Sequence, residues 1–395
     1  RRLRADGPRR ARGSDVTRLL ALLGLLLAAL LAALPAAAGW FAVDDAARAD
    51  WHVARLAPDR WEMRRRAPPA GPERTVMVLY PRASSAYDVA MSTLLRDFAG
   101  RPLNVRFLAV TWDRDPARGA ALLAEAAAQG HALLYAMGSE TAAWLHERRD
   151  RLATPAVTVC AKDPVLMGQV PDHDGPRGGM IAYTSLNPAL GVQVAHLMAL
   201  RPGLRAVGVL VDATNLSAVE TQAEPIIAAL GPMGVDAFAV TVRDPAQAQT
   251  ELRAALPEAL ARMRARDPDL SRSLFWITGS TSVFAEIETL VAGAGPVPLV
   301  AAAPEIVRPG PFSAATAVGV GFEANAHLAA VYGAAVLDGR PPGSLPVGVV
   351  SPPDVALNFL RLRAAGLRVP FAMLEAAAWV YDAQGRPARL RGAPP

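Results

Sequence analysis

Short apolar runs that lead into small polar residues recur along this chain. Five of them, at 75–80, 132–136, 156–160, 207–211 and 274–277, are followed within a few residues by Ser, Thr, Asp or Asn. Because these runs lack polar alternation, they predict strands buried on both faces, as in a parallel sheet covered by helices. In open α/β sheets, ligands bind at the carboxyl ends of the strands. The pattern therefore predicts a protein that holds a small molecule at polar sheet edges.

Helical segments alternate with these strands from residue 75 onward, an order typical of βαβ units. The expected helices span 86–99, 116–129, 140–151, 188–200, 217–230, 245–266, 283–294 and 323–337. Further strands are expected at 103–110, 180–183, 237–242, 298–302 and 315–320. Ser85, Asn187 and Asp244 stand where a side chain would cap the following helix.

The strands fall into two groups that divide near residues 185–188, and 395 residues exceed what one hydrophobic core usually serves. We therefore expect an α/β protein with two Rossmann-like lobes, each built on a parallel sheet and joined by a multi-strand hinge. The N-terminal lobe is expected to comprise 74–184 and 314–338, and the C-terminal lobe 185–313 and 339–382. Residues 39–73 are expected to form an irregular spacer and residues 383–395 a tail.

The positive charge of the chain is concentrated at its start. Residues 1–38 carry seven arginines and two aspartates, a surplus that equals the net charge of +5 of the whole chain. The rest is formally neutral and has no basic stripe, which argues against nucleic acid as a partner.

The same N-terminal residues predict export. Arginines up to Arg18, an apolar run at 19–34 and small residues at 36–38 follow the plan of a secretory signal peptide, and the alanines after Pro35 favour cleavage. Residues 19–38 are also long enough to span a bilayer, so an uncleaved membrane anchor is the alternative. In both cases the folded body is expected in the periplasm.

Signals for an enzyme are weak. None of the six histidines pairs with another at metal-ligand spacing, and the one cysteine, Cys160, excludes an intrachain disulfide. The segment 279–282 lacks the second glycine of a nucleophile elbow, and 319–324 resembles a dinucleotide fingerprint without opening a complete βαβ unit. We expect no metal, no cofactor and no catalysis; a hydrolase that uses Ser84, Ser139 or Ser280 is a third alternative.

Candidate ligand contacts in the first lobe follow three of the apolar runs. They are Ser84, Ser85, Tyr87, Ser139, Glu140, Thr141, Lys162 and Asp163. Hydroxyls and free backbone N–H groups at a helix start suit an anionic group, although such serines also serve as plain caps and Glu140 is favoured at any helix start. Lys162 is the one lysine of the chain, which suggests a specific task. The alternative is a lysine retained by chance on a solvated loop, where a pair with Asp163 would contribute little to stability.

The second lobe supplies a matching set at its own strand ends. It consists of Asn215, Ser217, Ser280, Thr281 and Ser282, with Phe322 and Glu323 where the chain would cross back. Capping of the following helices is the simpler explanation for the polar residues. Phe322 is suited to stacking on a flat ligand, but an aromatic after a strand is more often part of the core.

Several segments together resemble a known family. They are 136–142, 159–165, 178–185, 206–217 and, most specifically, 338–347 (DGRPPGSLPV) with 355–358 and 364–370. In this order they are similar to the substrate-binding proteins of ABC-type importers, in the branch that includes tryptophan and other aromatic amino-acid binders. The resemblance covers residues 75 to about 382. It implies the type I periplasmic-binding-protein fold, a small solute as ligand and a membrane ABC permease as partner.

Two departures from the family pattern concern the ligand. The family often carries an aspartate at the fourth strand end, where this chain has Gly-Ser-Thr-Ser-Val at 279–283, and its tyrosines are missing at 320–325. The resemblance therefore implies a small polar or amino-acid-like solute without naming it. We expect a monomeric solute-binding protein; the alternative is a membrane-tethered ligand-sensing or partner-binding module with the same fold, which an uncleaved 19–38 segment would favour.

Overall fold

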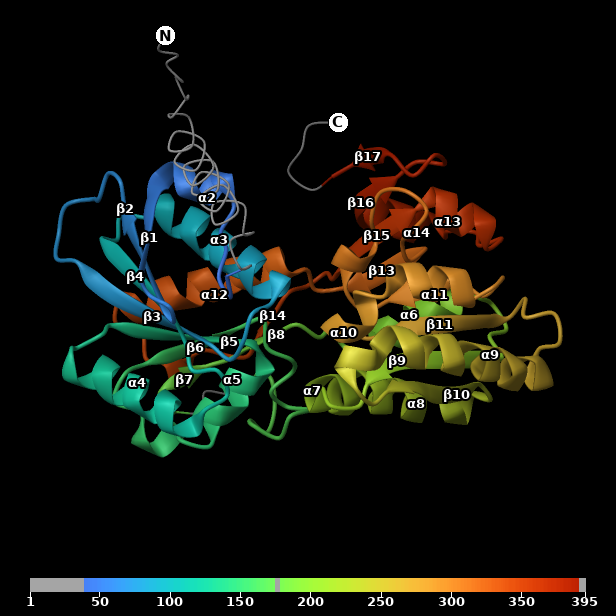
Figure 1. Ribbon diagram of the computed structural model, residues 1–395, viewed down its shortest axis with the longest axis horizontal. Helices are drawn as coiled ribbons and strands as arrows, with labels where there is room; N and C mark the ends of the chain where they lie inside the picture. Colours follow the sequence, from blue (N-terminus) through green and yellow to red (C-terminus); the bar gives the residue numbers. More distant parts are fainter. Residues whose placement is uncertain (1–38, 175–177, 391–395) are drawn as a thin grey trace, which may run out of the picture. The chain divides into compact units, whose positions relative to one another are not determined.

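The computed structural model describes residues 39–174 and 178–390. The chain divides into two compact units after Ala42, and the larger unit, which starts at Val43, contains all the helices and strands described below. They confirm the α/β class (Figure 1). The expected signal peptide or anchor at 1–38 lies outside the described residues. Within the described ranges, no helix combines the length and apolar character that crossing a membrane requires.

The first sheet is mainly parallel. In the described chain it has seven strands in the order β1-β2-β4-β3-β5-β6-β7. They are β1 (Trp51–Ala57), β2 (Arg60–Arg65), β3 (Arg74–Tyr80), β4 (Val105–Thr111), β5 (Leu133–Met137), β6 (Ala156–Val159) and β7 (Ile181–Ala182). The strands from β4 to β7 run parallel, whereas β1 and β2 form an antiparallel edge.

Helices cover both faces of this sheet (Figure 1). Helices α4 (Pro116–Ala128) and α5 (Gly138–His146) pack on one face through a core that includes Leu122, Trp144 and Leu145. Helices α3 (Ser85–Ala99) and α12 (Phe322–Leu337) contact each other on the opposite face, together with α2 (Asp45–Asp50). The Oη of Tyr135 on β5 donates to the carbonyl oxygen of Ala329 on α12 at 3.1 Å, so α12 belongs to the first lobe.

The second sheet repeats this plan. Among the described residues it has eight strands in the order β10-β9-β11-β12-β13-β15-β16-β17. They are β9 (Ala206–Asp212), β10 (Asp236–Val242), β11 (Ser273–Ile277), β12 (Leu299–Ala301), β13 (Thr316–Gly319), β15 (Asp354–Asn358), β16 (Ala377–Tyr381) and β17 (Pro387–Arg389). The strands from β10 to β13 are parallel, and β15 joins β13 in the antiparallel sense.

Two cores enclose the second sheet. One face packs against α9 (Ala248–Arg266), α10 (Thr281–Phe284) and α11 (Ile287–Gly293). The other packs against α6 (Leu190–Leu200), α8 (Glu224–Leu230), α13 (Phe359–Ala364) and α14 (Phe371–Ala376). A short helix α7 (Leu216–Ala218) and a π-helical turn (Val219–Ala223) lead into α8. Every residue of β5, β6, β9 and β11 is buried, which confirms the interpretation of the unbroken apolar runs.

Three segments connect the two lobes in the part of the chain that is described. The first follows β8 (Thr184–Ser185), and the second follows β14 (Gly348–Val349), which pairs with β8 in a separate two-stranded sheet. The third runs through Val320 and Gly321, between β13 of the second sheet and α12 of the first lobe. These three segments are called the hinge below.

Residues 39–73 do not form a spacer. They contain α2, β1 and β2, and β2 pairs with β4 at the edge of the first sheet. Each strand has one buried residue, Trp51 in β1 and Met63 in β2, and its other positions are partly or fully exposed and include arginines. Both strands therefore lack the apolar run of an inner strand. Trp51 is buried, and its Nε1 donates to the carbonyl oxygen of Leu95 at 2.9 Å.

Further expectations also need correction. Residues 339–347, expected in the second lobe, pack on the first, where Gly343 bonds to the backbone of Gly178 and Val347 joins the core. Residues 314–319 belong to the second lobe, because β13 pairs with β12 and β15, and the chain crosses only after Gly319. The expected tail contains β17, which pairs with β16. Asn187 does not cap α6, whose N-cap is Ala189; its side chain serves the hinge instead.

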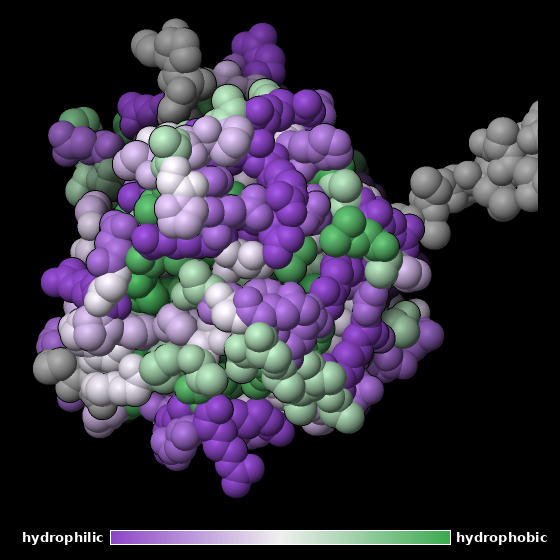
Figure 2. Space-filling view, turned by 90° about the vertical axis from the view of Figure 1, so that its left-hand side faces the viewer, coloured by the Kyte–Doolittle hydropathy of each residue, from purple (hydrophilic) through white to green (hydrophobic). Residues whose placement is uncertain are grey.

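Hydrophilic residues dominate one end of the molecule. Figure 2 shows the face that lies on the left in Figure 1, where hydrophobic residues form only scattered groups. The first lobe also carries ion pairs between its outer strands and helices, such as the one between Arg60 on β2 and Glu125 on α4 at 2.6 Å. Such pairs at partly exposed positions contribute little to stability.

Candidate ligand-binding site

Polar strand ends from both lobes meet around one small cavity of about 50 Å³. Its lining residues are Arg82, Ser84, Ala86, Tyr87, Ser139, Glu140, Cys160, Lys162 and Leu186 on the first-lobe side and at the start of the hinge, Asn215, Ser217, Gly279 and Thr281 of the second lobe, and Phe322 at the start of α12. These residues follow β3, β5, β6, β9 and β11, so the carboxyl ends of both sheets face the same space. This is the position at which open α/β sheets bind ligands.

Three helices of the first lobe begin at this cavity. Ser84 is the N-cap of α3 but makes no capping hydrogen bond, Ser139 lies in the first turn of α5, and Phe322 opens α12. Helix N-termini carry a partial positive charge and unsatisfied N–H groups. The first-lobe wall is therefore suited to negative or strongly polar ligand atoms.

Glu140 does not leave a free negative charge at the cavity. Its carboxylate accepts two hydrogen bonds from Arg114, each at 2.7 Å, and a longer one from Arg82 at 3.4 Å. Burial opposes its charge, but the hydrogen bonds and positive charges of Arg114 and Arg82 hold the pKa of Glu140 below its ordinary value. With two guanidinium groups around one carboxylate, this part of the rim is net positive.

Gly138 allows α3 and α5 to approach closely at the cavity. Its φ of +75° is in the left-handed region, and a Cβ at this position would lie 2.0 Å from the Oη of Tyr87. Tyr87 in turn packs edge-to-face against Tyr80 with ring centroids 6.0 Å apart. A side chain at position 138 would therefore displace Tyr87 from the wall of the cavity.

Lys162 reaches across the cavity toward the second lobe. Its backbone N–H donates to the Oγ of Ser139 at 2.9 Å, and a Cβ at Gly279 would lie 2.5 Å from its Nζ. The side chain is only 8% exposed. Burial lowers the pKa of Lys162 to about 8, although the negative charge of Glu305 acts in the opposite direction.

The second-lobe wall is organised by Asn215 and Gly279. The Oδ1 of Asn215 accepts from the Oγ of Ser217 at 2.9 Å and from the backbone N–H of Ala218 at 3.3 Å, so it caps α7. The N–H of Gly279 donates to the Oε1 of Gln222 at 2.7 Å. These bonds hold the loop after β11 against the π-helical turn and place Thr281 at the cavity.

The structure brings most of the predicted contact residues together and places the others elsewhere. Those that line the cavity are Ser84, Tyr87, Ser139, Glu140, Lys162, Asn215, Ser217, Thr281 and Phe322. Those outside its lining are Ser85, Thr141, Asp163, Ser280, Ser282 and Glu323.

The residues outside the lining have other partners or face solvent. Thr141 is buried and its Oγ1 accepts from the Nε1 of Trp112 at 3.0 Å. Ser280 and Ser282 bond within the second lobe, Glu323 pairs with Arg96 at 3.0 Å, and Ser85 is exposed. The expectation that they touch a ligand therefore has no support in the geometry.

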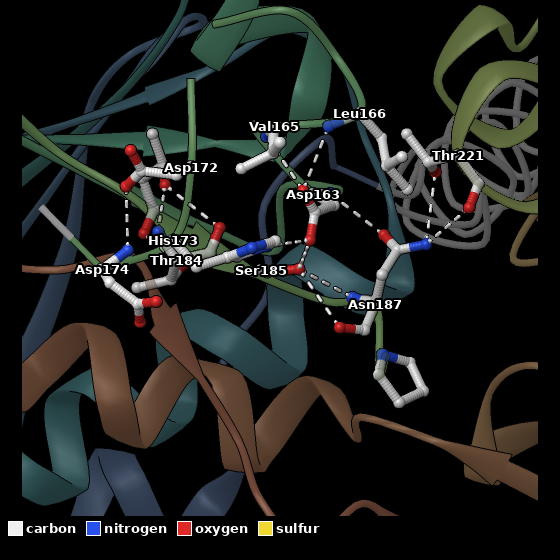
Figure 3. A network of polar contacts seen from close by, with 12 residues as sticks. Asp163, Val165, Leu166, Asp172, His173, Asp174, Thr184, Ser185, Asn187 and Thr221 are labelled. Atoms are coloured by element: carbon white, nitrogen blue, oxygen red, sulfur yellow. Dashed lines mark hydrogen bonds and ion pairs between the residues drawn. The ribbon is translucent and has the colours of Figure 1, made fainter. Parts of the chain in front are cut away.

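Asp163 holds the hinge instead of facing the cavity (Figure 3). Its carboxylate accepts from the backbone N–H groups of Val165 and Leu166 at 2.8 and 3.1 Å, and from Ser185 Oγ at 3.3 Å. The Nε2 of His173 lies 2.7 Å from the Oδ2 of Asp163. The turn that carries Lys162 is thus bonded to the first hinge segment.

Sequence reasoning missed Glu305, which follows β12. Its Oε1 accepts from the backbone N–H of Phe322 at 2.6 Å, while its Oε2 is buried without a hydrogen-bond partner in the described structure. Burial raises the pKa of Glu305 to about 7. A strand followed by a polar residue is present here too, but Ala302, Ala303 and Pro304 separate β12 from the carboxylate. Arg82 and Cys160 were also missed as lining residues.

At least four larger grooves, of about 320 to 480 Å³, lie elsewhere on the described surface. One of about 450 Å³ runs between β10 and α9, and another of about 480 Å³ lies beside α3 and α12. None of the four collects strand ends from both sheets. Their position gives no reason to regard them as the ligand site, despite their size.

Solved structures of other proteins are similar in fold to this chain. No family model matches the sequence, and no curated protein matches it. A conserved domain protein from Vibrio cholerae is similar in structure with a TM-score of 0.60 and 20% identity, covering 78% of this chain and 99% of its own. An ABC domain from Streptococcus pneumoniae in complex with L-Trp has a TM-score of 0.59 and 18% identity, covering 78% and 100%.

Two further solved structures extend this picture. A substrate-binding protein with adhesive properties from Clostridium difficile, in a ligand-free open form, has a TM-score of 0.56 and 15% identity, covering 77% of this chain and 97% of its own. An ABC transporter solute-binding protein from Agrobacterium vitis with bound allitol has a TM-score of 0.51 and 15% identity, covering 72% and 95%. The chain thus has the fold of type I periplasmic binding proteins.

Proposed function

We propose that this protein is an extracytoplasmic solute-binding protein of an ABC-type importer, which captures a small polar solute between its two lobes. The observation that carries the proposal is the cavity to which both sheets contribute polar strand ends. Structures with the same fold include one with L-Trp and one with allitol, which supports a small solute. The N-terminal pattern of 1–38 supports export.

The arrangement of the cavity suits capture by closure. A solute that contacts Ser84 and Ser139 on one side and Thr281 on the other binds only when the lobes are together. Its differential affinity for that state shifts the population toward it. A permease in the membrane would then recognise the closed form.

Binding fits the cavity better than catalysis. A serine nucleophile needs a neighbouring base. In the described structure the Oγ of Ser139 accepts from the backbone N–H of Lys162, and no basic side chain is hydrogen-bonded to Ser84 or Ser139. Burial raises the pKa of the Cys160 thiol far above its ordinary value, so it stays protonated and a poor nucleophile. Hydrolysis through Ser84 or Ser139 therefore has no chemical support.

A membrane-tethered sensing module is the second candidate. The observation that favours it is the length of the apolar segment 19–38, which matches a bilayer span. The mass of the mature protein separates the two: loss of the first 38 residues or so supports the importer component, and an intact N-terminus supports the tethered sensor.

A solute screen tests the proposed function. Purified protein is heated with amino acids including L-tryptophan, polyols including allitol and glycerol, and short carboxylates, and each hit is titrated by calorimetry. A bound solute is expected to raise the melting temperature and to bind with one site per chain. Failure of every solute to stabilise the protein would contradict the proposal.

A matched pair of variants locates the site. Thr281→Val removes a hydroxyl from the cavity and is expected to weaken binding about tenfold, because a ligand hydrogen bond is lost at constant side-chain size. Thr250→Val makes the same change at an exposed position of α9 and should leave affinity unchanged. Equal effects of the two substitutions would place the solute elsewhere.

A further inference from the structure

Lys162 is the only lysine in a chain that otherwise uses arginine for its permanent positive charges. Its position is not that of a solvated surface residue. The side chain is 8% exposed, and its Nζ lies at the cavity, opposite the backbone of Gly279 in the second lobe. Among the described residues, the Nζ has no hydrogen-bond or ion-pair partner.

The surroundings of Lys162 do not neutralise it. Cys160, two residues before it, is a protonated thiol. Glu140 and Arg82 also line the cavity, but they are paired with each other, and Glu140 has a second arginine partner in Arg114. Glu305 acts on Lys162 from a distance, and its own carboxylate is bonded to the N–H of Phe322.

An isolated buried ammonium is unfavourable, because burial removes the hydration of its charge. Burial indeed lowers the pKa of Lys162 to about 8, so near neutral pH the group is still mostly protonated. A negatively charged partner inside the cavity would remove this penalty. The described residues supply none in contact with Nζ, which leaves that place for a ligand group.

We propose that the captured solute is an anion, whose carboxylate or comparable oxyanion pairs with the Nζ of Lys162. The inference rests on the proposed function and specifies its ligand class. The hydroxyls of Ser84, Ser139 and Thr281, with the N-termini of α3 and α5, supply further donors to the same group.

The size of the cavity agrees with this ligand class. Its volume of about 50 Å³ leaves space for one small polar group and not for a large ligand body. The part of the solute that this cavity encloses is therefore the anionic group itself, held beside the Nζ of Lys162. Any larger portion would require the lobes to separate further.

Pairing with an anion also has a measurable consequence for the proton on Lys162. A negative partner raises the pKa of the ammonium back toward its ordinary value. At pH 8, where about half of the Lys162 side chains are protonated, binding of an anion therefore takes up about half a proton. A neutral solute would produce no such uptake.

Small probes of different charge test the proposal on the full-length protein. Acetate, glycolate and inorganic phosphate represent anions, glycerol a neutral solute, and methylammonium a cation. At least one anion is expected to raise the melting temperature, while glycerol and methylammonium do not. Calorimetry at pH 8 in buffers of different ionisation enthalpy is expected to report proton uptake with the active anion. If acetate or glycolate stabilises the protein and phosphate does not, the anionic group of the solute is a carboxylate. The reverse result indicates a phosphate.

Three variants assign the effect to Lys162. Lys162→Met is expected to fold, since it removes a buried charge, and to lose at least tenfold in anion affinity together with the proton uptake. Lys162→Arg keeps a permanent charge and should retain part of the affinity without the uptake. Arg253→Met removes an exposed charge on α9 and should change neither.

The outcomes separate the ligand class from the function. Binding of a neutral or cationic solute with equal affinity in the wild type and Lys162→Met would overturn the inference and leave solute capture intact. Anion binding with equal affinity in the wild type and Lys162→Met would also overturn it. If no solute in the wider screen binds, both the proposed function and the inference are contradicted.

Discussion

The Nδ2 of Asn187 donates to the backbone oxygen of Thr221 at 3.0 Å. Asn187 belongs to the first hinge segment and Thr221 to the π-helical turn of the second lobe. The Oδ1 of the same amide accepts from the backbone N–H of Asp163 at 3.0 Å, in the turn that carries Lys162. One buried side chain thus links both lobes next to the cavity.

Removal of this link should weaken both stability and solute capture. Asn187→Ala leaves the N–H of Asp163 and the oxygen of Thr221 buried without their partner, which is expected to cost about 2 kcal/mol in the free energy of unfolding. Denaturant titration measures this loss, and calorimetry measures the affinity for the solute found in the screen. Asn104→Ala removes an exposed hydrogen bond to Gly71 and serves as the control; a loss as small as in this control would show that the link is unimportant.

Gly138 and Gly234 separate two causes of a requirement for glycine. Both have a positive φ, of +75° and +78°, but a Cβ at Gly138 would meet Tyr87 Oη at 2.0 Å, whereas nothing lies within 4 Å of one at Gly234. Gly234→Ala is therefore expected to cost about 1 kcal/mol, and Gly138→Ala roughly 2 to 4 kcal/mol. Chemical denaturation gives both values. Equal losses of unfolding free energy would mean that the displacement of Tyr87 does not destabilise the protein.

Glu305 predicts a pH dependence of stability. In the folded protein its pKa is raised to about 7, above the ordinary value of 4.5, because of burial. Between these values the unfolded chain binds fewer protons than the folded one, so the contribution of Glu305 to stability decreases as pH rises through this window, by up to about 3 kcal/mol. Glu305→Gln, which cannot release a proton, should lack this decrease.

The comparison of denaturation curves at several pH values isolates this effect. The difference in unfolding free energy between Glu305→Gln and the wild type is expected to grow in favour of the variant from pH 4.5 to pH 7. Glu288→Gln on the exposed side of α11 is the control and should run parallel to the wild type. Parallel curves for Glu305→Gln would show that its carboxylate is not perturbed in the folded state.

The inner strands were predictable because burial on both faces leaves a strong record in the sequence. The run 206–212 is apolar up to its final aspartate, and it forms β9, an inner strand between β10 and β11 of the second sheet. The helices were located as the segments that alternate with these strands. β1 and β2 were missed because an antiparallel edge strand needs apolar residues only on one side, and their arginines resemble an irregular segment.

The candidate site was predictable only to the level of the strand end. Ser84, Ser139 and Thr281 line the cavity because every parallel strand presents its carboxyl end at the same edge. Asp163 stands at such an end as well, but His173, Ser185 and two backbone N–H groups take its carboxylate. Whether a polar side chain at a strand end faces the cavity depends on partners that are distant in sequence, and the local sequence pattern does not show them. β13 was placed in the wrong lobe because a strand of this kind fits either sheet equally well.

The central claim is that one solute bridges the two lobes at this cavity, and a crystal structure of its complex tests it most directly. Protein crystallised with the solute that gives the largest thermal shift is expected to show ligand density in contact with Ser84, Ser139 or Lys162 on one side and with Asn215 or Thr281 on the other. Density confined to one lobe, or seated in the groove between β10 and α9, would contradict the account.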